Sequence, residues 1–214
     1  MQGVAQAVSE LTEQGEPAFE AVVPILSQLL KAETAEREVR SRANQLKTAR
    51  FPAYRDLNGF DFTSSEVNEA LARQLHRCEF MEGAHNVVLV GGPGTGKTHI
   101  ATALGVQAVE HHHKRVRFFS TVELVNALEQ EKAQGKAGQI ATRLTHCDLV
   151  ILDELGYLPF STSGGALLFH LLSKLYERTS VVITTNLSFS EWPASASGSP
   201  RQSHPSPQRR RQGT

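Results

Sequence analysis

The feature that most constrains the fold is the stretch VVLVGGPGTGKTHIATAL, residues 87–104. Four apolar residues suited to a buried strand run directly into a glycine-rich loop, and the loop ends at Lys97 and Thr98. The spacing matches GxxxxGK[ST], which a chain of this length meets by chance on the order of once in a hundred. The residues that match this phosphate-binding pattern are Gly91, Gly92, Pro93, Gly94, Thr95, Gly96, Lys97 and Thr98.

These residue types suit the binding of a phosphate chain. Glycines let successive backbone N–H groups turn inward onto phosphate oxygens, and a helix N-terminus adds its positive dipole end. We expect Lys97 to reach the β and γ phosphates and Thr98 to place its hydroxyl on Mg²⁺. The alternative is a glycine turn that only joins a strand to a helix.

Two polar sites follow later apolar runs. Asp153 and Glu154 come directly after LVIL, at the carboxyl end of an expected strand, where ligands of open α/β sheets bind. We expect Asp153 to hold Mg²⁺ and Glu154 to orient and polarise the attacking water, which favours NTP hydrolysis over a small-molecule kinase. Asn186 ends the run VVITTN and is expected to hold the same water; strand-end Asn is otherwise turn chemistry.

Alternation of apolar runs and helical patterns organises the middle of the chain. It predicts an α/β fold whose parallel sheet carries helices on both faces. The expected strands are 87–90, 116–119, 149–152 and 181–185. The expected helices are 97 to about 110, 121 to 133, 137 to 144 and 164 to about 178.

Helices are also expected before the first strand. Apolar spacing predicts a helix over residues 17–50, in which Pro24 is tolerated only if it sits in a first turn, and Phe51-Pro52 ends this helix. Between Arg37 and Arg55 stand six Lys or Arg residues against one Glu. This basic run is a candidate for phosphate-backbone contact, and a solvated helix face is its alternative.

Capping patterns predict where two of the helices begin. Thr63 with Glu66 forms a capping-box pattern, and Ser120 with Glu123 repeats it before the helix from 121. The first of these helices is expected to bury one face, made of Val67, Leu71 and Leu75.

Composition limits the other possibilities. Lys plus Arg equals Asp plus Glu at 22 each, so overall charge gives no argument for nucleic acid. Cys78 and Cys147 are expected to be free, packed thiols in a reducing compartment, and His111–His113 a solvated helix end rather than a metal site. The sequence shows neither a leader pattern nor about 18 consecutive apolar residues, so we expect a cytoplasmic protein without membrane contact.

Five runs of sequence carry a resemblance that covers about residues 20–192. They are FDFTSSEVNEALARQL, GGPGTGKTHIA, VRFFSTVELVNAL, LVILDELGYLP and VVITTNLSFSEW. Together they resemble the AAA+ ATPases, and among these the IstB-like transposition helper ATPases, relatives of the DnaC-like helicase loaders. The resemblance implies a P-loop NTPase that binds ATP and Mg²⁺, oligomerises on double-stranded DNA, and hands that DNA to a transposase.

The resemblance also assigns parts of the chain. It places the family's phosphate loop on residues 91–98, its two carboxylates on Asp153 and Glu154, and its sensor amide on Asn186. It implies a helical N-terminal region over residues 1–60, an ATPase core over 61–192, and a tail over 193–214.

The tail departs from the family's pattern. Residues 193–214 contain no Val, Ile, Leu, Met or aromatic residue, so we expect disorder, with a frameshift soon after Trp192 as the leading hypothesis. The resemblance implies that a fifth strand beside 87–90, a closing lid and an arginine that serves the neighbouring subunit would lie there. Weak Mg-ATP binding and slow or absent hydrolysis are therefore expected. Alternatives are a DnaC-like replicative helicase loader and a truncated, non-enzymatic nucleotide-binding remnant.

Overall fold

The computed structural model describes residues 6, 9–10, 17–156 and 161–186, with only the backbone for 17–22. Contacts along the chain group into two compact units, Met1–Thr48 and Ala49–Thr214. The helices are α2 (Pro17–Ala49), α3 (Glu69–His76), the 3₁₀ turn η1 (Glu79–Met81), α4 (Lys97–Glu110), α5 (Thr121–Ala133), α6 (Gln139–Leu144) and α7 (Thr162–Leu175). The strands are β1 (Val87–Val90), β2 (Val116–Ser120), β3 (Leu149–Leu155) and β4 (Ser180–Thr185).

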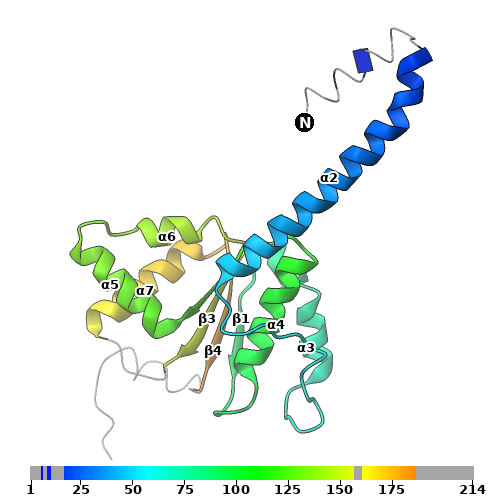
Figure 1. The fold of residues 1–214 in the computed structure, drawn as a ribbon. Helices are drawn as coiled ribbons and strands as arrows, with labels where there is room; N and C mark the ends of the chain where they lie inside the picture. The colour runs from blue at the N-terminus through cyan, green and yellow to red at the C-terminus, as the bar shows by residue number, and fades with distance from the viewer. Residues whose placement is uncertain (1–5, 7–8, 11–16, 157–160, 187–214) are drawn as a thin grey trace, which may run out of the picture. The chain divides into compact units, whose positions relative to one another are not determined.

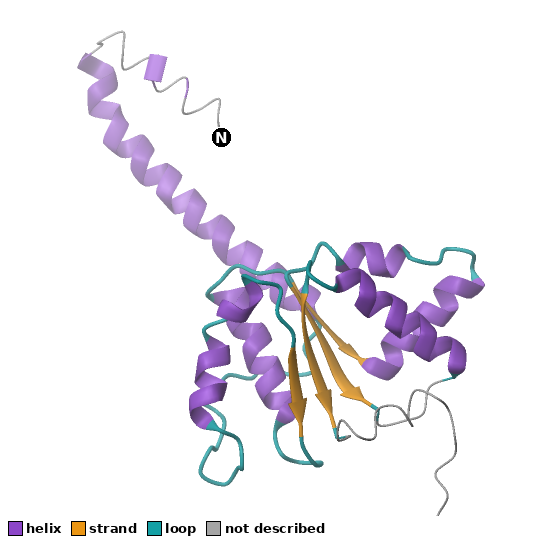
Figure 2. Cartoon of the chain, turned by 180° about the vertical axis from the view of Figure 1, so that it is seen from behind, coloured by secondary structure: helices purple, strands orange, loops and turns teal. Residues whose placement is uncertain are grey.

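The second unit is a layered α/β structure. Its four strands are all parallel and lie in the order β1-β4-β3-β2. Helices α3 and α4 cover one face of the sheet, and α5, α6 and α7 cover the other (Figures 1 and 2). The predicted α/β class, with a parallel sheet between two helical layers, is confirmed.

Alternating side chains of the central strand β3 serve both layers. Val150 and Leu152 are fully buried in a cluster with residues of α5, α6 and α7. Ile151 points the other way, towards α4, where a Cβ added to Gly105 would lie 2.8 Å from its Cδ1. Burial of a side chain of this size contributes about 1.5–3 kcal/mol to the free energy of unfolding. Packing on both faces therefore stabilises β3 in the sheet.

After Val87, three elements have a boundary that differs by two or more residues from the predicted one. β3 continues to Leu155 because its pairing with β4 shifts register rather than ending at Leu152. α6 begins at Gln139, after Gly138 in the left-handed conformation (φ 95°). α7 begins at Thr162, two residues early, and ends at Leu175, because Tyr176 adopts an extended ψ of 132°.

The predicted capping box of Thr63 and Glu66 is wrong. Thr63 donates both its N–H and its hydroxyl to Oδ1 of Asp61, in a turn that precedes the helix. Asn68 caps α3 instead, because its side chain accepts from the Leu71 N–H at 3.0 Å. The turn uses the threonine, so the N-cap lies five residues later than that pattern predicts, at Asn68 instead of Thr63.

Two further details of the predicted helices are wrong. Val67 lies before α3, and Leu71 is 53% exposed, so only Leu75 of the three predicted residues packs against buried residues from within the helix. Ser120 occupies the N-cap position of α5, as predicted, but its side chain makes no capping hydrogen bond.

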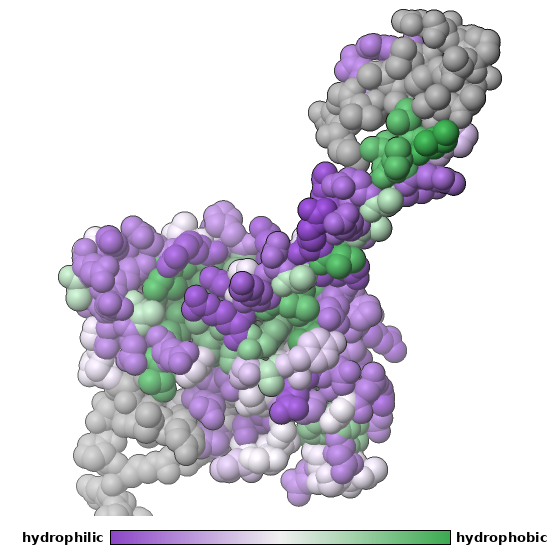
Figure 3. Space-filling view, viewed as in Figure 1, coloured by the Kyte–Doolittle hydropathy of each residue, from purple (hydrophilic) through white to green (hydrophobic). Residues whose placement is uncertain are grey.

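Helix α2 belongs mainly to the first unit. Pro24 lies inside this helix, past its first turn, so the condition under which the sequence pattern tolerates it is not met. The predicted end is confirmed: the helix stops at Ala49, and Arg50 takes a left-handed φ of 61° before Phe51. Apolar side chains gather on the surface of α2 (Figure 3), and the exposed ones are Val23, Ile25, Leu29 and Val39.

Strand β1 occupies one edge of the described sheet. Within the part of the chain that the structure describes, β1 pairs with one strand, β4, and Val90 at its end is 46% exposed. The expectations placed on residues after Asn186, including Trp192 and the tail 193–214, lie outside the described residues. None of the described helices is long and apolar enough to span a membrane.

Candidate functional site

The glycine-rich loop joins β1 to α4 at the carboxyl edge of the sheet. Gly94 and Gly96 have positive φ angles of 75° and 86°, a conformation that costs other residues about 1–2 kcal/mol. The loop is anchored where it begins, because the Gly91 N–H donates to the Thr185 carbonyl of β4 at 3.2 Å. The helix that follows starts at Lys97, so its free N–H groups and positive dipole end face the loop.

The Lys97 side chain folds back over this loop. Its Nζ donates to the Gly91 carbonyl at 2.8 Å and to the Gly92 carbonyl at 2.6 Å. Thr95 steadies the same turn, since its hydroxyl donates to the Gly92 carbonyl at 2.9 Å. The ammonium group therefore adds its charge to that of the helix end, which makes the concave side of the loop an anion-binding surface.

Thr98 on α4 meets Asp153 on β3. The Thr98 hydroxyl lies 3.0 Å from each carboxylate oxygen of Asp153. Asp153 is only 7% exposed, so its carboxylate is largely shielded from solvent. A hydroxyl and a carboxylate are hard oxygen donors, the type that Mg²⁺ prefers.

Glu154 occupies a β-bulge. Leu152 pairs with Ile183 and Leu155 with Thr185, so Asp153 and Glu154 stand opposite a single residue of β4. Glu154 adopts a left-handed φ of 61° and its side chain is exposed. The bulge thus turns two consecutive acids apart, with Asp153 inward against Thr98 and Glu154 outward.

Three threonines that the sequence analysis did not single out hold this bulge. Thr121, at the start of α5, donates its hydroxyl to the Asp153 carbonyl at 2.7 Å. Thr185 donates to the Leu155 carbonyl at 2.7 Å. Thr184 contacts both acids, through the Asp153 side chain and the Glu154 N–H. Thr184 and Thr185 stand at the polar end of the run VVITTN, but the sequence alone does not indicate which groups they bond to.

A cleft of about 400 Å³ opens between the loop and the ends of β3 and β4. It brings together predicted residues from three separate segments, because Glu154 and Asn186 line it with Lys97 and Thr98. Asp153 lies beside it, hydrogen-bonded to Thr98. The full lining is Pro93, Gly94, Gly96, Lys97, Thr98, Glu154, Thr184, Thr185 and Asn186.

An aromatic cluster supports the loop from the segment before α3. A Cβ added to Gly96 would lie 2.3 Å from the Phe60 ring, so this ring packs directly on the glycine. Phe60 makes edge contacts with Phe62 at 4.7 Å and with His99 at 5.2 Å between ring centroids. His99 Nε2 also lies 2.7 Å from the Asp56 carbonyl. Sequence analysis missed this cluster because its members are distant along the chain.

The other candidates of the sequence do not join this site. Among the described residues no group of three or more His, Cys, Asp or Glu is placed to hold a metal ion, and His111 simply ends α4. Both cysteines are free, with Cys78 buried and Cys147 partly buried. Burial raises the pKa of Cys78 to about 11, and desolvation likewise raises the pKa of Cys147, as expected for packed thiols.

The basic run is part of a charged helix surface. Arg37 and Arg40 pair with Glu33 and Glu36 one turn earlier, at 3.4 and 2.9 Å. All four side chains are at least half exposed, so each pair contributes about 0.3–0.5 kcal/mol. These two arginines are thus partly neutralised by their own helix.

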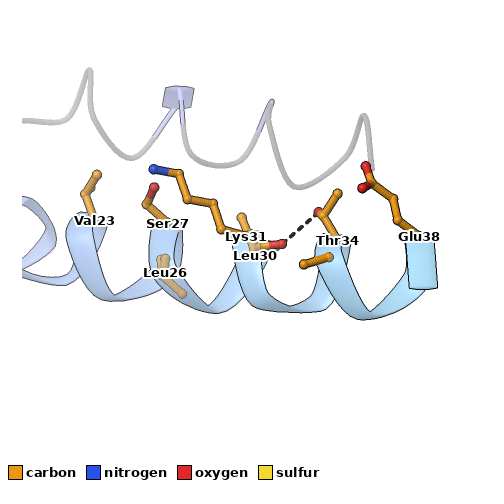
Figure 4. A pocket seen from close by; sticks show the side chains of 8 residues that line it. Val23, Leu26, Ser27, Leu30, Lys31, Thr34 and Glu38 are labelled. Carbon is orange, nitrogen blue, oxygen red and sulfur yellow. Dashed lines mark hydrogen bonds between the residues drawn. The ribbon is translucent and has the colours of Figure 1, made fainter. Parts of the chain in front are cut away.

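A second hollow, of about 490 Å³, runs along α2. Figure 4 shows the side chains that line it following one face of this single helix, with the Thr34 hydroxyl bonded to the Leu30 carbonyl. Its lining is mainly apolar, with one lysine and one glutamate, Lys31 and Glu38. Its described lining residues all belong to one helix and do not present converging backbone N–H groups as the glycine loop does.

The parallel sheet, the glycine loop before α4, and the acids at the end of β3 define a P-loop NTPase fold. The profile of the family described as IstB-like ATP binding protein matches residues 1–200. This chain therefore belongs to the IstB-like ATP-binding family.

Relatives agree with this assignment. A Pseudomonas aeruginosa protein named as an ATP-binding protein of insertion sequence IS21 is 35% identical over 193 residues, which are 90% of this chain and 72% of that protein. A Geobacillus stearothermophilus protein named likewise for IS5376 is 32% identical over 168 residues. These residues are 78% of this chain and 66% of the relative, so the chain spans about two thirds to three quarters of the length of these two relatives.

Solved structures show the same fold. The crystal structure of the DnaC helicase loader has a TM-score of 0.54 and 26% identity, and the match covers 64% of this chain and 84% of the loader. The AMPPCP-bound DnaA of Aquifex aeolicus has a TM-score of 0.54 and 24% identity, over 70% of this chain and 46% of DnaA. The second similarity shows the fold alone, and together they place the sheet and its helices among the AAA+ proteins.

Proposed function

We propose that this protein binds Mg-ATP in the cleft beside the glycine loop, hydrolyses it, and uses the nucleotide to prepare double-stranded DNA for a transposase. One observation carries the nucleotide part. Lys97, Thr98 and Glu154 line one cleft, and the Asp153 carboxylate lies beside it, hydrogen-bonded to the Thr98 hydroxyl, although these residues come from separate segments. The family assignment and the names of the relatives support the rest.

The loop would hold the phosphates. Its backbone N–H groups and the N-terminus of α4 supply fixed partial positive charge, which favours a polyphosphate. Lys97 already lies over the loop, so its ammonium needs only to exchange two carbonyl partners for phosphate oxygens. Charge-assisted hydrogen bonds of this kind are worth about 1.5–3 kcal/mol.

The oxygen donors suit a magnesium ion. Thr98 and Asp153 supply a hydroxyl and a buried carboxylate, and a hard cation is the natural partner of such a pair. When bound, the ion would neutralise charge on the β and γ phosphates. Asp153 keeps its orientation through its bond to Thr98, so the acid is preorganised for this role.

The outward carboxylate is proposed to act on water. Glu154 lines the cleft and its side chain is exposed, so we expect it to accept a proton from an attacking water and to orient the lone pair of that water. Asn186 lines the same cleft and would hold that water through its amide. Hydrolysis, rather than transfer to a second substrate, follows from this second carboxylate.

Nucleotide binding is tested with Lys97→Ala. We expect the variant to bind a fluorescent ATP analogue about 10- to 100-fold more weakly, because one charge-assisted contact is lost. Ala53→Ser, a surface change outside the cleft, serves as the matched control. Equal binding by wild type and Lys97→Ala would refute the proposed site.

The DNA-directed part is tested with the insertion sequence's own components. We expect ATP to increase retention of duplex DNA by this chain, and we expect the transposase encoded beside it to co-purify with the protein–DNA complex. Single-turnover hydrolysis is measured with and without duplex, because slow or absent turnover is expected. DNA retention that ignores ATP would contradict this part while leaving nucleotide binding intact.

A replicative helicase loader is the second candidate. It is favoured by the structural similarity to the DnaC helicase loader at 26% identity. Reciprocal pull-downs separate the two: capture of a replicative helicase and not the transposase would decide for the loader. A self-associating oligomer is compatible with both, and sedimentation with and without ATP would measure it.

A further inference from the structure

Thr184 is the one residue of β4 that stands opposite the two acids of the bulge. Leu152 pairs with Ile183 and Leu155 with Thr185, which leaves Asp153 and Glu154 facing Thr184 alone. The Thr184 side chain is fully buried. A two-against-one bulge leaves a ladder N–H without its regular partner, so the residue opposite determines how that group is satisfied.

The Thr184 hydroxyl bonds to both acids at once. It donates to Asp153 Oδ1 at 2.5 Å and accepts from the Glu154 N–H at 2.9 Å. A hydroxyl has a single proton, and a backbone N–H can only donate. The direction of both bonds is therefore determined: the proton must point at the Asp153 carboxylate.

These two bonds link the two proposed roles. The bond to Asp153 turns that carboxylate so that it also meets the Thr98 hydroxyl, at 3.0 Å from both oxygens. The bond from the Glu154 N–H helps to keep Glu154 at its left-handed φ of 61°, which directs its side chain outward. One buried hydroxyl thus sets the orientation of one acid and the backbone of the next.

We infer that Thr184 is a positioning residue, whose hydroxyl couples the metal-binding geometry of Asp153 to the water-orienting geometry of Glu154. This inference rests on the proposed function for its metal and water, while the coupling itself concerns this chain's own atoms. Thr184 lines the cleft, but its hydroxyl is used by Asp153 and Glu154, so it acts through them. Neither the glycine loop nor the acidic pair alone supplies this link.

The test compares two hydroxyl variants with a matched control. Thr184→Val keeps the shape and removes both bonds, and Thr184→Ser keeps the hydroxyl. Thr179→Val is the control, because Thr179 is also a buried threonine and donates to the Cys147 carbonyl at 3.0 Å, at the other end of β4. A general loss of packing or stability would affect both valine variants.

The first measurement is the Mg²⁺ concentration that half-saturates binding of a fluorescent ATP analogue. We expect Thr184→Val to raise it by about 10- to 100-fold, as loss of an outer-sphere partner does at metal sites. Thr184→Ser and Thr179→Val should stay within about threefold of wild type. Equal Mg²⁺ dependence for the two valine variants would overturn the inference.

The second measurement needs no nucleotide. Amide hydrogen exchange at Glu154 reports whether its N–H is bonded, since bonded amides are protected. We expect protection in wild type and Thr184→Ser, and exchange at least about tenfold faster in Thr184→Val. An unprotected Glu154 amide in wild type would overturn the inference without any variant. The inference therefore remains testable even if Thr184→Val does not fold.

The two measurements separate two kinds of failure. If wild type binds no nucleotide but Glu154 loses protection only in Thr184→Val, the proposed function is wrong and the structural coupling holds. If nucleotide binds normally and neither measurement responds to Thr184→Val, the coupling is wrong and the proposed function stands.

Discussion

The glycine loop and the acidic bulge are two halves of one cleft, but they are built differently. The loop is contiguous, residues 91–98, and its shape comes from glycines with positive φ and from Lys97 bonded to loop carbonyls. The bulge is two residues long, and it is held by hydroxyls from α5 and β4, far along the chain. One half is made by local conformation and the other by packing of distant strands.

This difference predicts different sensitivities. A change in the loop should act through backbone conformation, because glycine there meets a conformational requirement. A change in the bulge should act through side-chain hydrogen bonds, because a non-glycine residue there holds a left-handed φ that its surroundings must support. Both halves nevertheless depend on β4, since the Gly91 N–H is bonded to Thr185.

The largest expected effect is a loss of ATP hydrolysis without a loss of nucleotide binding. Glu154→Gln keeps the size of the side chain but removes the proton acceptor, so single-turnover ATP hydrolysis should fall by about 10²- to 10⁴-fold. Binding of a non-hydrolysable ATP analogue should change little, because the loop and Lys97 are untouched. The measurement pairs quenched-flow hydrolysis with analogue titration. Unchanged hydrolysis would show that Glu154 does not act on the water.

The second effect tests whether the stability of the loop depends only on its own backbone conformation or also on the Phe60 ring. Gly96→Ala and Gly94→Ala both force a side chain into a positive φ, which costs about 1–2 kcal/mol each. At Gly96 the new Cβ also meets the Phe60 ring at 2.3 Å, which adds about 1–3 kcal/mol of overpacking. At Gly94 nothing lies within 4 Å.

Urea unfolding measures this difference. Gly94→Ala is the matched control, and Gly96→Ala should lose more of the free energy of unfolding by the overpacking increment. In a Phe60→Ala background, adding Gly96→Ala should lose no more of the free energy of unfolding than Gly94→Ala does, because the clashing ring is gone. Equal losses in the two single variants would mean that Phe60 does not support the loop.

A third, smaller effect concerns strain in the bulge. Glu154→Gly relieves a left-handed conformation that costs about 1–2 kcal/mol, while glycine loses about 0.4–1 kcal/mol more through the unfolded chain. The net result is a gain of about 1 kcal/mol in the free energy of unfolding. Glu154→Gln is the control, because it removes the carboxylate but keeps a side chain at the left-handed φ. A destabilised Glu154→Gly would show that the carboxylate itself contributes stability.

The smallest effect lies in the turn that precedes α3, next to Phe60. Hydrogen bonds from the Thr63 hydroxyl, Ser64 and the Thr63 N–H lower the pKa of Asp61 from 3.8 to about 2. Because the folded state favours the ionised form, its stabilising contribution is complete above pH 3.8 and is lost as pH falls towards 2.

Asp61→Asn tests this pH dependence. The variant should be less stable than wild type above pH 3.8, and the difference should shrink as pH approaches 2. Urea midpoints across that range measure this difference. Asp148, whose carboxylate accepts a hydrogen bond from the Arg115 N–H, is present in both proteins, so its titration does not contribute to the difference. A difference that does not vary with pH would place the effect of Asp61 in packing rather than in its charge.

Much of the fold was predictable from local patterns. The four strands and the helix from Lys97 to Glu110 follow apolar runs and a glycine loop whose meaning is contained in adjacent residues. The predictions failed where a polar residue had a choice of partner. Thr63 bonds to Asp61 and not to the helix, and Asn68 takes the cap, because nearby turn geometry offered a better acceptor.

The site divides along the same line. By itself the sequence determined the loop 91–98 and nominated Asp153, Glu154 and Asn186, since strand ends and glycine spacing are local signals. Only the tertiary structure decided that Thr184 stands against a two-residue bulge and that Phe60 packs on Gly96. Strand register and ring packing depend on which distant segments become neighbours, and hydrogen bonds between them form only when the sheet has assembled.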